Sequence, residues 1–159
     1  MMHWYKKLAL ILPILMFCGV SYSREESLLF KDDSPRLSKE YQELNNKNPI
    51  LREIVDDVAA KVYKDLKEPI VITQIFRTQK EQDRLYRYSG KYKRKKFKSP
   101  HQFYQAIDLR SWKFSRRYIR KLKRYINKKY NEGNYYRLTF TYHAIKGNIK
   151  HIHIQFAKP

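Results

Sequence analysis

The chain has 159 residues, which is room for one domain with a single hydrophobic core once a leader is set aside. Its 35 Lys and Arg against 15 Asp and Glu give a net charge of +20. This charge favours an anionic partner, which could be a nucleic acid, an anionic lipid or an acidic cell-wall polymer. The alternative is a solvated basic surface without a specific partner. Cys18 is the only cysteine and lies in the leader, so a disulfide and a thiol nucleophile are excluded from the rest of the chain.

Residues 1–23 have the pattern of an export signal. Lys6 and Lys7 form a positive region, residues 8–20 are mainly apolar, and residues 21–23 form a small-x-small cleavage site. The apolar run is shorter than the about 20 residues that span a bilayer. The pattern therefore predicts an exported protein, periplasmic or extracellular, with an uncleaved signal anchor as the alternative.

Residues 24–48 are polar and mixed in charge, and we expect a linker that leads into a short helix from about Ser38. Asn48 and Pro49 then supply the cap and first-turn proline of a helix over 49–67. Apolar residues recur along it at helical spacing, namely Ile50, Leu51, Ile54, Val55, Val58, Val62 and Leu66. Pro69 ends this helix, and residues 70–76 indicate a buried strand.

Arg77 follows that strand, and Thr78 is placed to cap a helix over 79–88. A guanidinium can hold a carboxylate or an amide oxygen through two parallel hydrogen bonds, which suits a peptide ligand, and an ordinary surface arginine is the alternative. Residues 91–98 hold six basic residues with Tyr92 and Phe97 between them. This mixture is typical of single-stranded nucleic-acid binding, but a solvated loop at the rim of a cleft is favoured.

A further strand is predicted over 106–110, and Ser115 is placed to cap an amphipathic helix with basic residues on its outer face. Such a helix can lie on an anionic membrane surface, but packing against a sheet is favoured. A turn at 131–134, a strand over 136–145 and a hairpin turn at 146–148 lead into a last strand over 149–156. This order predicts a single α+β domain with a small antiparallel sheet flanked by helices.

Four residues have the types and spacing of a metal site. His101 and Asp108 stand seven positions apart, and His151 and His153 follow on the last strand, where alternation puts both histidines on one face. Neutral imidazole and carboxylate bind zinc well, and a catalytic zinc keeps three protein ligands and an open fourth position. The sequence thus predicts one zinc ion on the antiparallel sheet.

The pattern of Ser99, His101, Asp108 and a terminal His-x-His strand resembles the zinc peptidases of peptidoglycan, the family of D-alanyl-D-alanine carboxypeptidases and L-alanyl-D-glutamate endopeptidases. Its fold group includes lysostaphin-type peptidases and hedgehog domains. Residues 72–82 with Leu85 and Tyr86 look like the family's strand, arginine and helix, so the likeness covers roughly residues 70–156. It implies zinc ligands at His101, Asp108 and His153, a catalytic histidine at His151, and substrate contacts from Arg77, Gln82 and Ser99.

Two positions depart from the family's pattern. Tyr104 stands where the family usually has glycine, and Lys150 stands where many members have an acid three residues before the last ligand. Glu132 is the only carboxylate after Asp108, at a turn that is hard to bring to the metal, so His151 is the better base. His143 is read as a packed or surface residue, with support of the site as the alternative.

The resulting division of the chain is a signal peptide over 1–23, a linker and short helix over 24–48, and a zinc peptidase domain over 49–159. The expected function is zinc-dependent hydrolysis of an amide bond in peptidoglycan stem peptides by a monomer, with anionic wall polymers as further partners of the basic surface. A catalytically inactive, metal-binding domain for wall binding or signalling is the alternative. A basic nucleic-acid-binding protein is disfavoured by the export signal, and no specific nucleic acid is expected as a partner.

Overall fold

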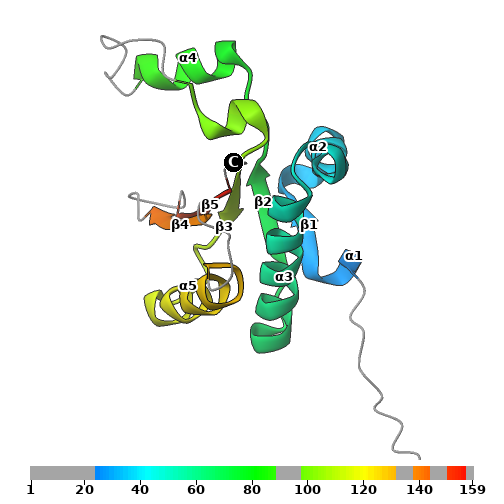
Figure 1. Ribbon diagram of the computed structural model, residues 1–159, viewed down its shortest axis with the longest axis vertical. Helices are drawn as coiled ribbons and strands as arrows, with labels where there is room; N and C mark the ends of the chain where they lie inside the picture. Colours follow the sequence, from blue (N-terminus) through cyan, green and yellow to red (C-terminus); the bar gives the residue numbers. More distant parts are fainter. Residues whose placement is uncertain (1–23, 89–97, 132–137, 144–149, 157–159) are drawn as a thin grey trace, which may run out of the picture.

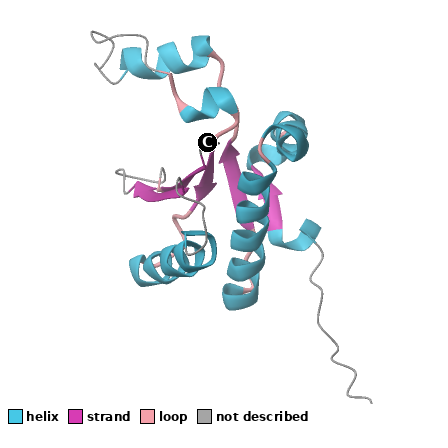
Figure 2. Cartoon of the chain, in the orientation of Figure 1, coloured by secondary structure: helices cyan, strands magenta, loops and turns pink. Residues whose placement is uncertain are grey.

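The computed structural model describes residues 24–88, 98–131, 138–143 and 150–156. Five strands form one sheet in the order β1-β2-β3-β5-β4, and helices lie against it (Figures 1 and 2). The strands are β1 (Leu28–Phe30), β2 (Ile70–Gln74), β3 (Ala106–Arg110), β4 (Leu138–His143) and β5 (His151–Phe156). The helices are α1 (Arg24–Ser27), α2 (Pro35–Lys47), α3 (Pro49–Leu66), α4 (Gln79–Tyr88) and α5 (Arg116–Asn131), with short 3₁₀ turns η1 (Lys31–Asp33) and η3 (Pro100–Phe103). The predicted α+β class with flanking helices is confirmed.

Side-chain caps begin the helices where the sequence predicts. Asn48 Oδ1 accepts a hydrogen bond from the Leu51 amide at 3.2 Å, and Ser115 Oγ accepts one from the Tyr118 amide at 3.1 Å. Thr78 Oγ1 likewise accepts from the Glu81 amide at 3.2 Å. The predicted helices over 49–67 and 79–88 are therefore confirmed to within one residue of their ends.

The apolar stripes of α3 and α5 and one face of the sheet meet in a single core. Fully buried members include Ile54 of α3, Ile126 of α5 and Ile154 of β5, and burying each such side chain contributes about 1.5–3 kcal/mol. Strand alternation turns the intervening residues to the opposite face. We call that opposite side the polar face, and its half-buried members include Asp108, Arg110, His151, His153 and Gln155.

The segment over 24–48, which the sequence presents as a linker, belongs to the folded domain. β1 pairs in parallel with β2, from Leu28 beside Ile70 to Phe30 beside Ile72. α2 begins at Pro35 instead of Ser38, and its buried residues pack into the core. A three-residue strand among charged neighbours has too few positions to show an alternation in sequence. The sheet is therefore antiparallel at β3, β4 and β5 and parallel at its β1 edge.

Several predicted segments lie outside the described residues: the export signal over 1–23, the hairpin at 146–148 and most of the basic stretch over 91–98. The predicted turn at 131–134 also lies outside them except for Asn131, which is the last residue of α5. Within the described part of the chain, no helix combines the length and the apolar character needed to cross a membrane. On α5, Arg117, Arg120 and Arg124 are exposed and border a surface hollow. Binding of anionic wall polymers by the basic surface stays a prediction.

Candidate metal centre

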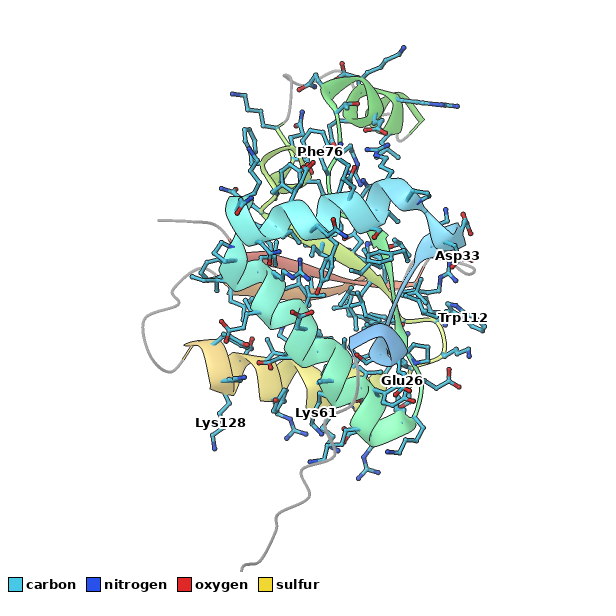
Figure 3. All side chains as sticks on the ribbon, turned by 90° about the vertical axis from the view of Figure 1, so that its right-hand side faces the viewer. Glu26, Asp33, Lys61, Phe76, Trp112 and Lys128 are labelled. Carbon is cyan, nitrogen blue, oxygen red and sulfur yellow. The ribbon has the colours of Figure 1, made fainter. Side chains whose placement is uncertain are left out.

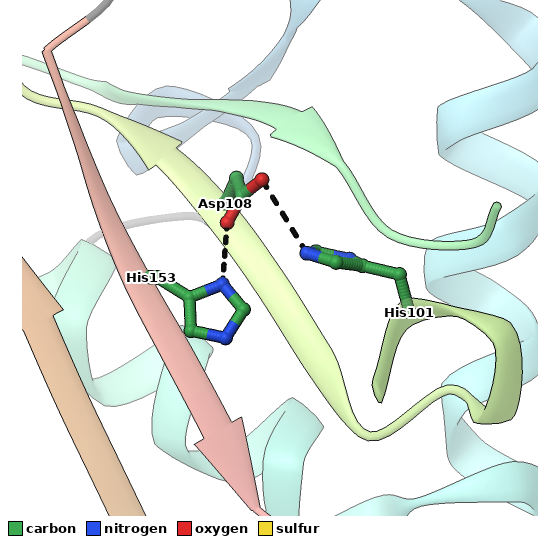
Figure 4. A group of neighbouring side chains, drawn as sticks. All are labelled: His101, Asp108 and His153. Carbon is green, nitrogen blue, oxygen red and sulfur yellow. Dashed lines mark hydrogen bonds and ion pairs between the residues drawn. The ribbon is translucent and has the colours of Figure 1, made fainter. Parts of the chain in front are cut away.

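The structure brings the three predicted ligands together from two strands and a turn. One ligand atom from each of His101, Asp108 and His153 lies within 4.8 Å of the others. The two carboxylate oxygens of Asp108 divide between the histidines: Oδ1 lies 2.7 Å from His153 Nδ1, and Oδ2 lies 3.4 Å from His101 Nε2 (Figure 4). Two imidazole nitrogens and a carboxylate converge on one point, so the group could hold a metal ion.

His101 is fixed by the turn η3 and by the end of β2. The Ser99 amide donates to Gln102 Oε1 at 2.7 Å, and the Arg77 amide donates to the His101 carbonyl at 3.3 Å. His101 Nδ1 lies 2.9 Å from the Ile75 carbonyl, which can only accept a hydrogen bond. Nδ1 therefore carries a proton, and Nε2 is the ring nitrogen that faces Asp108.

Asp108 and His153 are placed by the register of the central strands. β3 and β5 pair antiparallel with Asp108 directly opposite His153, and both side chains lie on the polar face. On the other side of β3, Thr73 Oγ1 donates to the Asp108 carbonyl at 3.1 Å. The distance between these two ligands is thus set by backbone pairing and not by a loop.

Burial and charge suit the site to a cation. His101 is 3% exposed, while Asp108 and His153 keep 13% and 17% of their side-chain surface. Burial alone raises the pKa of Asp108, but hydrogen bonds with His101 and His153 lower it well below its ordinary value. The site therefore presents an ionised carboxylate that remains partly open to solvent.

Two further histidines adjoin this group on the polar face. His151 lies two positions before His153 on β5, and its ring centroid is 4.8 Å from that of His143, its partner across β4. The His143 ring also lies 6.0 Å from the ring of His153. Partial burial and the neighbouring His151 and His153 lower the pKa of His143. The sequence alone predicts a packed or surface residue at His143, because its place beside His151 depends on the pairing of β4 with β5.

The predicted substrate residues lie beside the turn that carries His101. Arg77 donates from Nη1 to Gln82 Oε1 at 2.9 Å, and Gln82 is buried on α4. Ser99 is also buried and begins η3 through its backbone. Gln82 therefore positions Arg77, and Ser99 helps to position His101. Direct contact of these residues with a substrate stays a prediction.

Tyr104 ends η3 in the left-handed conformation, with φ of 55°, which explains why glycine would suit this position. Its ring stacks on Phe76 with centroids 5.0 Å apart, and its hydroxyl donates to Glu43 of α2. Asn48 also donates to the Tyr104 carbonyl at 3.1 Å. These contacts hold the Tyr104 ring in place at the end of η3.

The helix α4, which carries Gln82, is joined to α2 by an ion pair. Arg36 Nη1 lies 2.7 Å from Glu81 Oε1, and Arg36 Nε lies 2.6 Å from Glu40 Oε1. The hydrogen bond from Arg36, with help from Thr78, lowers the pKa of Glu81 to about 2. The contribution of this ion pair to the stability of the fold is therefore complete above the ordinary glutamate pKa of about 4.3. It is lost as the pH falls from that value toward the lowered pKa of Glu81.

We expect a carbon-detected NMR titration to show Glu81 losing its charge near pH 2. In Arg36→Gln the same carboxyl should titrate closer to its ordinary value, because its main hydrogen-bond partner is removed. Lys39→Gln on the same helix removes one exposed positive charge and serves as the control. An unchanged Glu81 titration in Arg36→Gln would show that this ion pair does not hold α4.

Comparisons with models of known protein families, with curated proteins and with solved structures find no match for this chain. Function is therefore inferred from the sequence motif and from the geometry of the site.

Proposed function

We propose that this protein is an exported zinc hydrolase that cuts an amide bond in peptidoglycan stem peptides, as a carboxypeptidase or an endopeptidase. The observation that carries the proposal is the convergence of His101, Asp108 and His153 within 4.8 Å on a partly accessible sheet face. Three protein ligands of nitrogen and oxygen type, with room for a further ligand, are the usual set of a catalytic zinc site. The resemblance of the motif to peptidoglycan peptidases supplies the substrate class.

Zinc bound here would polarise a carbonyl and lower the pKa of a bound water to about 7. The chain must then supply a base that takes a proton and passes it to the leaving amine. Asp108 is the only carboxylate in β3, β4 and β5, and it serves as a ligand. His151, on the same face of β5 as His153, is therefore the proposed base, and Arg77 is the proposed carboxylate anchor.

A second candidate is a metal-binding domain without catalysis. It is favoured by Lys150, which stands where many relatives of the motif have an acid, and by the absence of a second carboxylate from β3, β4 and β5. Such a protein would keep the ligands and bind wall peptides without cutting them.

Incubating purified muropeptides with the zinc-loaded protein distinguishes these two functions. Under the proposal, mass spectrometry shows a peptide shortened at one amide bond, a chelator stops the reaction, and added zinc restores it. Zinc-loaded protein that binds muropeptides and leaves every amide bond intact would contradict the hydrolase and support the second candidate.

Arg77→Lys is expected to raise KM about tenfold with little change in kcat, because lysine cannot reproduce the two-pronged contact with a carboxylate. Steady-state kinetics on a defined stem peptide measure this. Arg84→Lys, on the exposed part of α4, is the matched control and should leave both constants unchanged. Wild-type kinetics in Arg77→Lys would return Arg77 to the role of a structural partner of Gln82.

A further inference from the structure

A cavity of about 180 Å³ opens on the polar face around Arg110, which is two residues after Asp108 on β3. Its walls are largely apolar and include Leu29, Val71, Trp112 and Phe114, with the Arg110 side chain among them. Leu29 and Trp112 are 42% and 48% exposed, so large apolar groups face solvent here (Figure 3 labels Trp112). At about 30 Å³ for one water, the cavity has room for a short aliphatic group.

The strand register connects this cavity to the site. Arg110 follows Asp108 by two positions on β3, so both lie on the polar face about 7 Å apart along the strand. On one side, Arg110 is paired with His151 of the neighbouring strand β5. On its other side, the pairing of Ile72 with Leu109 puts Val71 next to Arg110. The cavity, Arg110 and His151 thus form one row that adjoins the row of Asp108 and His153.

Arg110 carries an uncompensated charge in this row. In the part of the chain that the structure describes, its guanidinium makes no hydrogen bond or ion pair. The other charged groups of the cavity, Glu68 and Lys113, pair with each other at 2.8 Å. Asp108 is engaged by the two histidine ligands. A half-buried guanidinium with apolar walls around it is suited to a carboxylate on a short aliphatic residue, because it can donate two parallel hydrogen bonds.

We infer that Arg110 and its cavity form a subsite for a free carboxylate of a peptide ligand, next to the metal centre on its His151 side. Arg77 adjoins the same centre on its His101 side, through the hydrogen bond between its amide and the His101 carbonyl. A ligand that crosses the centre therefore meets an arginine at each end. Resting on the proposed function, this assigns the preferred substrate: a stem peptide with a carboxylate on each side of the scissile amide.

The binding step can be measured without catalysis. The chain has two tryptophans, Trp4 and Trp112, so the full chain with Trp4→Phe reports on Trp112 alone by fluorescence. The protein is kept metal-free with a chelator, so that no probe can bind through a metal. Titration with N-acetylalanine should change the Trp112 emission and saturate, whereas N-acetylalaninamide should bind at least about tenfold more weakly, since it lacks the charge.

Arg110→Gln in the same background should remove the preference for the acid over the amide. Arg84→Gln, on the exposed part of α4, makes the same change of charge and should keep that preference. Equal binding of acid and amide by the chain with Arg110 intact would overturn the inference, and this comparison does not depend on the variant folding. An equal response to inorganic phosphate would also overturn it, because the cavity would then be a general anion site.

Turnover supplies a second measurement. If stem peptides are cut, Arg110→Gln should raise KM for a peptide with a free carboxylate on that side and leave KM for its amidated analogue unchanged. An equal effect on both peptides would contradict the subsite. Failure of hydrolysis itself would bear on the proposed function alone, since the titration of the metal-free protein does not depend on it.

Discussion

His101→Ala and His153→Ala are each expected to abolish stable zinc binding, whereas the unmodified chain should hold about one ion. Either change leaves two of three protein ligands and takes one histidine partner from the Asp108 carboxylate. Replacing a group that only supports a ligand typically costs 10–100-fold in metal affinity, so loss of a ligand itself should cost more. Zinc content after dialysis against a weak chelator, measured by mass spectrometry, gives the answer.

His143→Ala is the matched control for that experiment. It makes the same chemical change within ring contact of His153 but removes none of the three converging ligands, so the zinc content should stay near that of the unmodified chain. Circular dichroism of each variant checks the fold. Wild-type zinc content in a triple variant at His101, Asp108 and His153 would refute the site.

His151→Ala is expected to keep zinc and to lose about 10²- to 10⁴-fold in turnover, which is the usual contribution of a positioned acid or base. The reason is geometric: His151 lies on the face of β5 that carries His153, but it is not one of the three converging ligands. Stem-peptide hydrolysis and zinc content, measured on the same preparation, test both parts.

Other results for turnover or zinc content in His151→Ala would each point to a different role for this residue. Full turnover would contradict His151 as the base and turn attention to His143, whose ring lies 4.8 Å from it. Loss of zinc together with turnover would make His151 a ligand. Gln155→Ala, also on this face of β5, is a control for general disturbance of the strand and should retain most activity.

Local chemistry made much of the fold predictable. Asn48 and Pro49 mark the start of α3, the seven apolar positions behind them recur at helical spacing, and the alternation of His151 to Phe156 matches its buried pattern. These signals need no knowledge of distant residues. The ligand group was also predictable, since its residue types and spacing already indicate a metal, and the structure brings the three together.

The features that could not be predicted from the sequence depend on pairing between distant segments. Leu28–Phe30 becomes a strand because Ile70–Ile72 is available beside it. His143 joins the histidine cluster through the register of β4 with β5. Arg110 was placed on a strand, but its cavity exists only because β1 and residues 112–114 border it. Each of these facts depends on residues far away in the chain.

The sheet keeps its core on one face and its candidate metal ligands on the other. Because the core lies on the face opposite the candidate ligands, we expect apolar burial to hold the domain together without an ion, and contacts with Asp108 keep His101 and His153 close to it. This differs from small zinc domains that unfold when the metal is removed. We therefore expect an ion bound here to leave and return while the chain stays folded, so that its occupancy would follow the free metal concentration around the protein. Activity would then rise and fall with the local supply of zinc.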